Sequence, residues 1–170
     1  MFYGVILLVG VAAGSEDPLQ PLKGLRASAA AVGTGTEAGQ VAQESELPFE
    51  TIKSVADLQA RVAAASAEGR PVLLDFWATW CASCKEMDLY TFTDPAVHSA
   101  LGNAVLLRAD VTANDERDQA LLKHFGIFGP PTIAFYNSKG QEQKKFRVVG
   151  YMKAPEFAEV VRQAFSGLTT

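Results

Sequence analysis

The sequence predicts an α/β domain with a central mixed sheet of about four strands, flanked by helices. From Pro48 onward, strand-like and helix-like patterns alternate, which is typical of folds with parallel strand pairing. Residues 71–77 form a continuous apolar run, the pattern of a strand buried on both faces. With 170 residues, 48% of them hydrophobic, the chain can form one sizeable packed domain with tails.

The first elements follow from local signals. Ser54 with Asp57 three residues later resembles a capping box that begins a helix, and Gly69 is placed to end it. The apolar run 71–77 is then the first central strand, interrupted by one acid, Asp75. An Asp-Pro pair at 94–95 begins a short helix, with Asp as N-cap and Pro at the first helical position.

The second half of the domain continues the alternation. Residues 104–111 predict another central strand, and the next helix begins at Asn114 or Asp115 and ends at Gly126. The remaining predicted elements are a strand at 132–136, a turn at 137–140, a hairpin strand at 143–149 and a last helix from Ala154.

The N-terminal third has a different composition. Residues 1–14 form an uncharged apolar run, shorter than the roughly 20 residues that cross a bilayer. It predicts either the end of a transmembrane helix or a signal-like segment. Residues 15–47 are rich in small and polar types and predict a flexible linker, leaving 48–168 as the folded domain.

Charge and histidine content exclude several functions. A net charge of -4 gives no overall basic field, so nucleic acid is not an expected partner. The two histidines, His98 and His124, are far apart and lack zinc-finger spacing. We therefore expect no metal site, and no organic cofactor is required.

The two cysteines carry the main functional signal. Cys81 and Cys84 follow a buried strand at the expected start of a helix, which puts both sulfurs within disulfide reach on one helical turn. Free backbone N–H groups at a helix start stabilise a thiolate, so Cys81 is the expected nucleophile and Cys84 the resolving thiol. A zinc site and an inert structural disulfide are the alternatives, and redox chemistry is favoured over both.

Residues 76–85 (FWATWCASCK), together with Gly-Pro-Pro-Thr at 129–132, resemble the thioredoxin superfamily over about residues 49–165. The resemblance implies a thioredoxin-like fold. It also implies a cis peptide bond at Pro131, preceded by Pro130, in a substrate-binding loop against the sulfurs.

The resemblance implies roles for three more residues. Trp80 flanks the nucleophilic thiol and contacts substrate. Asp75 matches a buried acid behind the cysteines; as an unpaired carboxylate it tends to keep its proton and exchanges protons with Cys84. Asp88, one helical turn beyond Cys84, either faces the same sulfur and raises its pKa or lies on a solvated helix face.

Residues 73–101 and 106–122 resemble the C-terminal domain of the DsbD family of thiol:disulfide interchange proteins. The runs 91–95 (TFTDP) and 110–115 (DVTAND) are the most discriminating. This resemblance implies a bacterial inner-membrane protein with a monomeric globular domain in the periplasm, and residues 1–22 would be a membrane-helix end and its tail.

The same resemblance implies an electron relay. A membrane domain reduces this domain, which reduces a DsbD-type N-terminal domain that serves disulfide isomerases and cytochrome c maturation proteins. The expected activity is protein-disulfide reduction through the dithiol of Cys81 and Cys84. The alternatives are a free-standing membrane-tethered thioredoxin for cytochrome c maturation and a non-catalytic peptide-binding module with the same fold.

Overall fold

A computed structural model describes residues 46–167, so the predictions for residues 1–14 and for nearly all of 15–47 lie outside the described residues. The strands are β1 Glu50–Ile52, β2 Val72–Trp77, β3 Val105–Asp110, β4 Thr132–Tyr136 and β5 Val148–Val149. The helices are α3 Val55–Ala67, α4 Ala82–Glu86, the π-helix η2 Met87–Thr91, α5 Pro95–Leu101, α6 Glu116–Phe125, the 3-10 turn η3 Lys144–Phe146 and α7 Ala154–Ser166.

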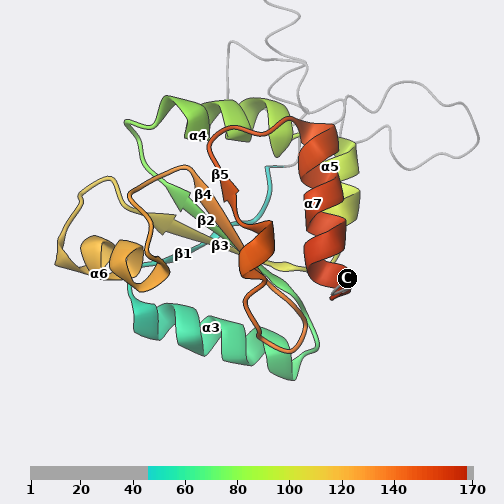
Figure 1. Cartoon of the computed structure of the whole chain (residues 1–170), viewed down its shortest axis with the longest axis horizontal. Coiled ribbons are helices and arrows are strands. Elements are labelled where there is room, and N and C mark those ends of the chain that lie inside the picture. Colours follow the sequence, from blue (N-terminus) through green and yellow to red (C-terminus); the bar gives the residue numbers. More distant parts are fainter. Residues whose placement is uncertain (1–45, 168–170) are drawn as a thin grey trace, which may run out of the picture. The chain divides into compact units, whose positions relative to one another are not determined.

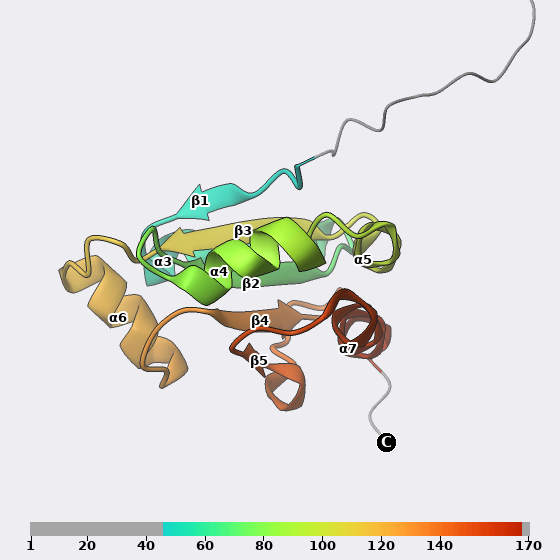
Figure 2. The ribbon, with the colours of Figure 1, turned by 90° about the horizontal axis from the view of Figure 1, so that it is seen from above.

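The five strands form one mixed sheet in the order β1-β3-β2-β4-β5 (Figure 2). The strands β1, β3 and β2 run parallel, and β4 and β5 are antiparallel to their neighbours. The predicted α/β class and mixed sheet are confirmed. The additional strand, β1, is only three residues long and buries only Ile52, which is too short a pattern to predict from sequence.

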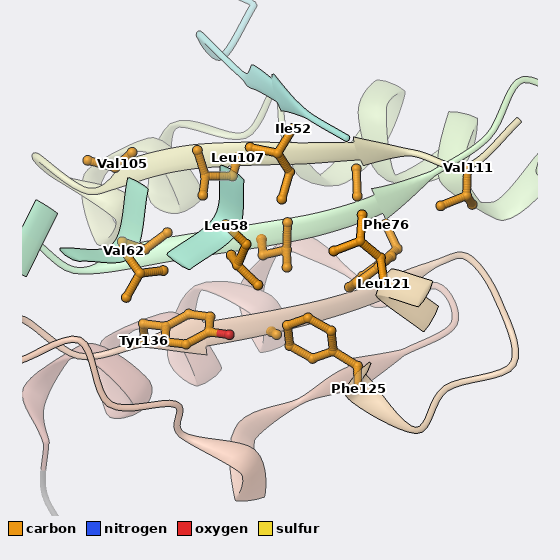
Figure 3. Close-up of a cluster of buried hydrophobic side chains, with 14 of the residues drawn as sticks. Ile52, Leu58, Val62, Phe76, Val105, Leu107, Val111, Leu121, Phe125 and Tyr136 are labelled. Carbon is orange, nitrogen blue, oxygen red and sulfur yellow. The ribbon is translucent and has the colours of Figure 1, made fainter. Parts of the chain in front are cut away.

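Helices cover both faces of the sheet, with α3 and α6 on one side and α4, α5 and α7 on the other (Figure 1). On β2, Leu74 and Phe76 point into the cluster under α3 and α6, which also holds Leu58 and Phe125 (Figure 3). Leu73 points into the opposite cluster, beneath α5 and α7. Because successive strand residues face opposite sides, a continuous apolar run fills both cores at once.

The predicted helix starts have the expected caps. The Ser54 side chain accepts a hydrogen bond from the Asp57 amide, and the Asp94 carboxylate caps α5. Asp115, the second of the two suggested residues, caps α6 in a full capping box, and Gly126 ends that helix with φ +63°. Each cap satisfies backbone groups that lack a partner within the helix.

The predicted strand 143–149 is wrong over most of its length. Val148–Val149 pairs with β4 as a strand, and the Gln143 amide donates to the Phe135 carbonyl oxygen of β4, but Lys144–Phe146 form a 3-10 turn between them. Consecutive polar residues at 143–145 give no alternation of apolar and polar side chains, so no face of such a strand would be buried. Within residues 46–167 no helix combines the length and apolarity that a bilayer crossing requires.

Candidate redox site

The two cysteines lie where β2 passes into α4. Cys81 is the N-cap of α4 and Cys84 lies in its first turn. They form a disulfide with an S–S distance of 2.08 Å and a Cα–Cα distance of 5.3 Å. The structure thus brings the predicted pair together and describes its oxidised form.

The backbone around Cys81 favours a thiolate. The amide of Cys84 donates a hydrogen bond to Cys81 Sγ at 3.2 Å. This amide is one of the N–H groups of the first helical turn that have no backbone partner within the helix. A donor aimed at the sulfur stabilises its ionised form. Cys84 is the more buried residue, 2% exposed against 6% for Cys81, and its Sγ lies 4.0 Å from the Phe76 carbonyl oxygen. This order of burial agrees with an attacking Cys81 and a shielded Cys84.

The loop before β4 contains the proline pair. The Pro130–Pro131 peptide bond is cis, as the family resemblance implies. The Pro131 carbonyl oxygen accepts a hydrogen bond from the Gly150 amide at 3.0 Å, which ties the loop to the end of β5. Phe128, two residues before this pair, is fully exposed.

Trp80 is 62% exposed, directly before the nucleophile. Single exposed apolar side chains are common, so it is the position of Trp80 beside a reactive cysteine that points to binding. The exposed side chains of Trp80 and Phe128 therefore offer apolar contact area on the two segments that the sequence assigned to substrate binding.

Asp75 is buried as predicted, but it is not unpaired. It lies directly opposite Arg108 in the parallel register of β2 and β3. Arg108 Nε donates to Asp75 Oδ2 at 2.9 Å, and Nη2 lies 2.8 Å from the same oxygen. Burial raises the pKa of Asp75 to about 6, the charge and hydrogen bond of Arg108 oppose that rise, and the nearby charge of Asp88 adds to it.

The described hydrogen bonds of Asp88 join it to Trp77 and Arg108. Its carboxylate accepts from Trp77 Nε1 at 2.9 Å and from Arg108 Nη2 at 2.6 Å. The carboxylate is one-third exposed, and the predicted effect of Asp88 on Cys84 stays a prediction. Asp88 acts on Asp75, because both carboxylates share the Arg108 guanidinium.

Arg108 is the residue of the site that the sequence prediction missed. Its guanidinium carbon also lies 4.2 Å from the Phe49 ring centre and 5.5 Å from that of Trp77, so aromatic faces cover the charge. A signal was present: the predicted central strands 71–77 and 104–111 contain one acid and one arginine respectively. Opposite charges on neighbouring buried strands are expected to pair.

The described residues 46–167 contain no group of three or more His, Cys, Asp or Glu side chains able to hold a metal ion. His98 Nε2 lies 2.6 Å from the Phe92 carbonyl oxygen, and the His124 ring packs edge-on against Phe125. His98 thus contacts the segment before its own helix, and His124 contacts a neighbour in α6.

Comparisons with known proteins agree with a thioredoxin-like fold. A family model described as a thioredoxin-like domain matches residues 58–165. The chain is 50% identical over 162 residues to the thiol:disulfide interchange protein DsbD of Ralstonia nicotianae, covering 95% of this chain and 25% of that protein. The chain therefore spans about a quarter of the length of this curated relative.

Two solved structures match the folded part. The DsbD C-terminal domain of Neisseria meningitidis in its oxidised form is 40% identical, with a TM-score of 0.60, and the match covers 68% of this chain and 99% of that domain. The reduced form of that domain gives the same identity and coverage with a TM-score of 0.59. By sequence and by fold, the chain belongs to the thioredoxin-like family and, within it, to the DsbD C-terminal domains.

Proposed function

We propose that the chain is a thiol:disulfide oxidoreductase that reduces disulfides in partner proteins through Cys81 and Cys84. The observation that carries this proposal is the disulfide at the N-terminus of α4, with an amide donor on Cys81 Sγ. The match to oxidised and reduced DsbD C-terminal domains supports a pair that cycles between the two states.

The reaction transfers two electrons. The Cys81 thiolate attacks a partner disulfide, forms a mixed disulfide and releases one partner thiol. Cys84 then loses its proton and attacks Cys81 Sγ, which releases the second partner thiol and leaves the Cys81–Cys84 disulfide. An upstream dithiol must reduce that bond before the next cycle.

Asp75 is the proposed proton acceptor for Cys84. With a pKa of about 6, its carboxylate is largely ionised at neutral pH and can take up the proton that Cys84 loses. Asp88 and Arg108 act on this carboxylate. The proposed contacts for the partner polypeptide are Trp80, next to the nucleophile in sequence, and the cis pair Pro130 and Pro131.

The proposed partners follow from the DsbD relatives. A membrane domain would supply electrons, and a DsbD-type N-terminal domain would accept them and pass them to disulfide isomerases and cytochrome c maturation proteins. This route places the chain at the bacterial inner membrane, with the globular domain in the periplasm. Protein disulfides are the substrate class in every variant of the proposal.

Insulin disulfide reduction, recycled by dithiothreitol, tests the activity. The wild-type chain should accelerate the reaction, and Cys81→Ser should fall to the uncatalysed rate because the nucleophile is lost. Ser83→Ala, between the cysteines, is the matched control and should keep most of the activity. Full activity in Cys81→Ser would reject the proposed chemistry.

Trapping identifies the partner. In Cys84→Ala the mixed disulfide on Cys81 cannot be resolved, so a partner disulfide is captured covalently. Capture of a DsbD-type N-terminal domain supports the relay. Capture of a cytochrome c maturation protein alone supports a free-standing thioredoxin, and no capture by a chain that still binds peptides supports a binding module.

A further inference from the structure

The run Asp110–Asp115, which distinguishes this sequence within its superfamily, lies against the segment before the nucleophile. The backbone amide of Thr79 donates to Thr112 Oγ1 at 2.9 Å, and Trp80 Nε1 donates to the Thr112 carbonyl oxygen at 3.3 Å. Thr79 and Trp80 immediately precede Cys81. One residue of the β3–α6 connection thus contacts both residues that lead into the reactive sulfur.

The orientation of Thr112 is itself fixed. Asp110 Oδ1 accepts from the Thr112 amide at 2.9 Å and also from the Thr112 hydroxyl. A hydroxyl has one proton to donate, so with that proton directed at Asp110 its lone pairs are left to accept from Thr79. The side chain therefore connects two segments with defined donor and acceptor roles.

Asp110 is tied in turn to a buried charge. Lys53 Nζ donates to the Asp110 carbonyl oxygen at 3.0 Å and also to the fully buried carboxylate of Asp118. Asp118 also accepts from the Asp115 amide at 3.2 Å, at the start of α6. Because the Asp118 carboxylate is fully buried, losing its partly exposed partner Lys53 would leave a buried charge unpaired, so the connection carrying Thr112 is held firmly by the β1–α3 junction and α6.

We propose that Thr112 is a positioning residue that holds Thr79 and Trp80 in the arrangement that receives the partner polypeptide beside Cys81. This inference rests on the proposed disulfide exchange. It concerns docking rather than sulfur chemistry, because Cys81 is held separately: its amide donates to the Ala78 carbonyl oxygen at 3.1 Å, and its sulfur accepts from the Cys84 amide. Trp80, mostly exposed, is the side chain whose presentation Thr112 controls.

The test compares Thr112→Val with Thr112→Ser in the full chain. Valine keeps the size of the side chain and removes the hydroxyl, whereas serine keeps the hydroxyl. In insulin disulfide reduction, Thr112→Val should raise KM about threefold to tenfold, the range expected for loss of the hydrogen bond from the Thr79 amide, with kcat within about twofold. The bond from the hydroxyl to Asp110 is also lost, but Asp110 keeps the Thr112 amide as a donor. Thr112→Ser should restore the wild-type KM. Ser166→Ala on α7 is the matched control: it removes an exposed hydroxyl that donates to the Gln163 carbonyl oxygen, away from the site, and should change neither constant.

Nuclear magnetic resonance on the unreacted oxidised chain gives a second readout. In Thr112→Val the Thr79 amide loses its acceptor, so its resonance should shift and its proton should exchange faster with solvent. The Trp80 indole resonance should shift because its acceptor, the Thr112 carbonyl, lies on a connection that is no longer held by the hydroxyl, while the resonance of the Trp77 indole, bonded to Asp88, should not shift. The serine variant should retain the wild-type shifts. These resonances report the contacts even if activity were lost for another reason.

The results that would contradict the role of Thr112 can be told apart from those that would contradict the proposed function. If Thr112→Val lowers kcat and thermal stability with KM unchanged, Thr112 is merely structural, because a loss of folded protein reduces the active concentration and not KM. Unchanged KM with unchanged Thr79 and Trp80 resonances also overturns the inference. If the wild-type chain itself fails to reduce insulin, the proposed function fails, whereas the resonance shifts still decide whether Thr112 holds the loop.

Discussion

At the scale of single residues, the site depends on one cation shared by two acids. When Asp75, Asp88 and Arg108 are all charged, the group carries one net negative charge inside a largely buried space. A proton on Asp75 makes the group neutral. Burial therefore favours one bound proton, which is the physical reason that the pKa of Asp75 rises to about 6.

The Asp75 shift predicts a pH-dependent stability. The folded chain keeps this proton up to about pH 6, whereas the unfolded chain loses it near its ordinary pKa of 3.8. The folded state therefore binds more protons, and stability falls as pH rises from about 4 to 6. Removing the charge with Asp75→Asn should raise the free energy of unfolding at pH 8 by about 1–3 kcal/mol. Urea unfolding should show that gain at pH 8 and not at pH 4; an equal gain at both would contradict the assignment.

Arg108 should affect the pH below which the proposed reaction slows. Its charge and hydrogen bond lower the pKa of Asp75, so Arg108→Gln should raise that pKa further. Because Asp75 must be ionised to accept the Cys84 proton, the acid limb of insulin reduction should move upward by about one pH unit. Arg108→Lys should restore part of the shift. The exposed Arg162, paired with Glu159, supplies the control Arg162→Gln, and equal profiles for the two glutamine variants would exclude the role.

At the scale of elements, short helices around the site depend on their caps. α5 has only seven residues and follows the π-helix that carries Asp88, so few internal hydrogen bonds hold it. The Asp94 carboxylate accepts from the Ala96 amide at 2.8 Å. Asp94→Ala should cost about 1 kcal/mol of stability in urea unfolding, and Asp94→Asn should recover most of it because it also caps well. Equal loss in both variants would indicate a role for the charge instead.

The helix ends and strands that the sequence predicted correctly are those whose signals are local. Caps at Ser54 and Asp94, the glycine end at Gly126 and the apolar run of β2 depend on a few consecutive residues. The strand predicted at 143–149 failed because the consecutive polar residues at 143–145 give no apolar face to bury, so only Val148–Val149 form a strand. The pairing of Asp75 also escaped prediction, since register between strands is set by the whole sheet.

At the scale of the whole molecule, large aromatic residues divide into core and surface. Phe157 is fully buried and packs against Phe92 and Phe135, with ring centres 5.6 and 6.1 Å away. Phe128 is fully exposed beside the cis proline pair. The same substitution at the two positions should therefore affect different properties: stability at Phe157 and partner binding at Phe128.

Phe157→Ala should destabilise the chain by about 3–5 kcal/mol, because it leaves a cavity between α7 and the sheet. Phe128→Ala should leave the thermal midpoint unchanged and raise KM for insulin, since its ring offers apolar contact area to a partner. Thermal unfolding and insulin reduction measured on both variants check this. A large loss of stability in Phe128→Ala, or unchanged KM, would show that this ring does not serve docking.

The sequence by itself determined the α/β class, the helix starts and the position of the cysteine pair, because these depend on local spacing and backbone geometry. Only the tertiary structure decided what surrounds the pair. It placed Arg108 between Asp75 and Asp88, and Thr112 beneath Thr79 and Trp80. Such contacts join residues that are more than 10 positions apart in the chain, and they arise only when strand register and helix packing fix the distances between elements.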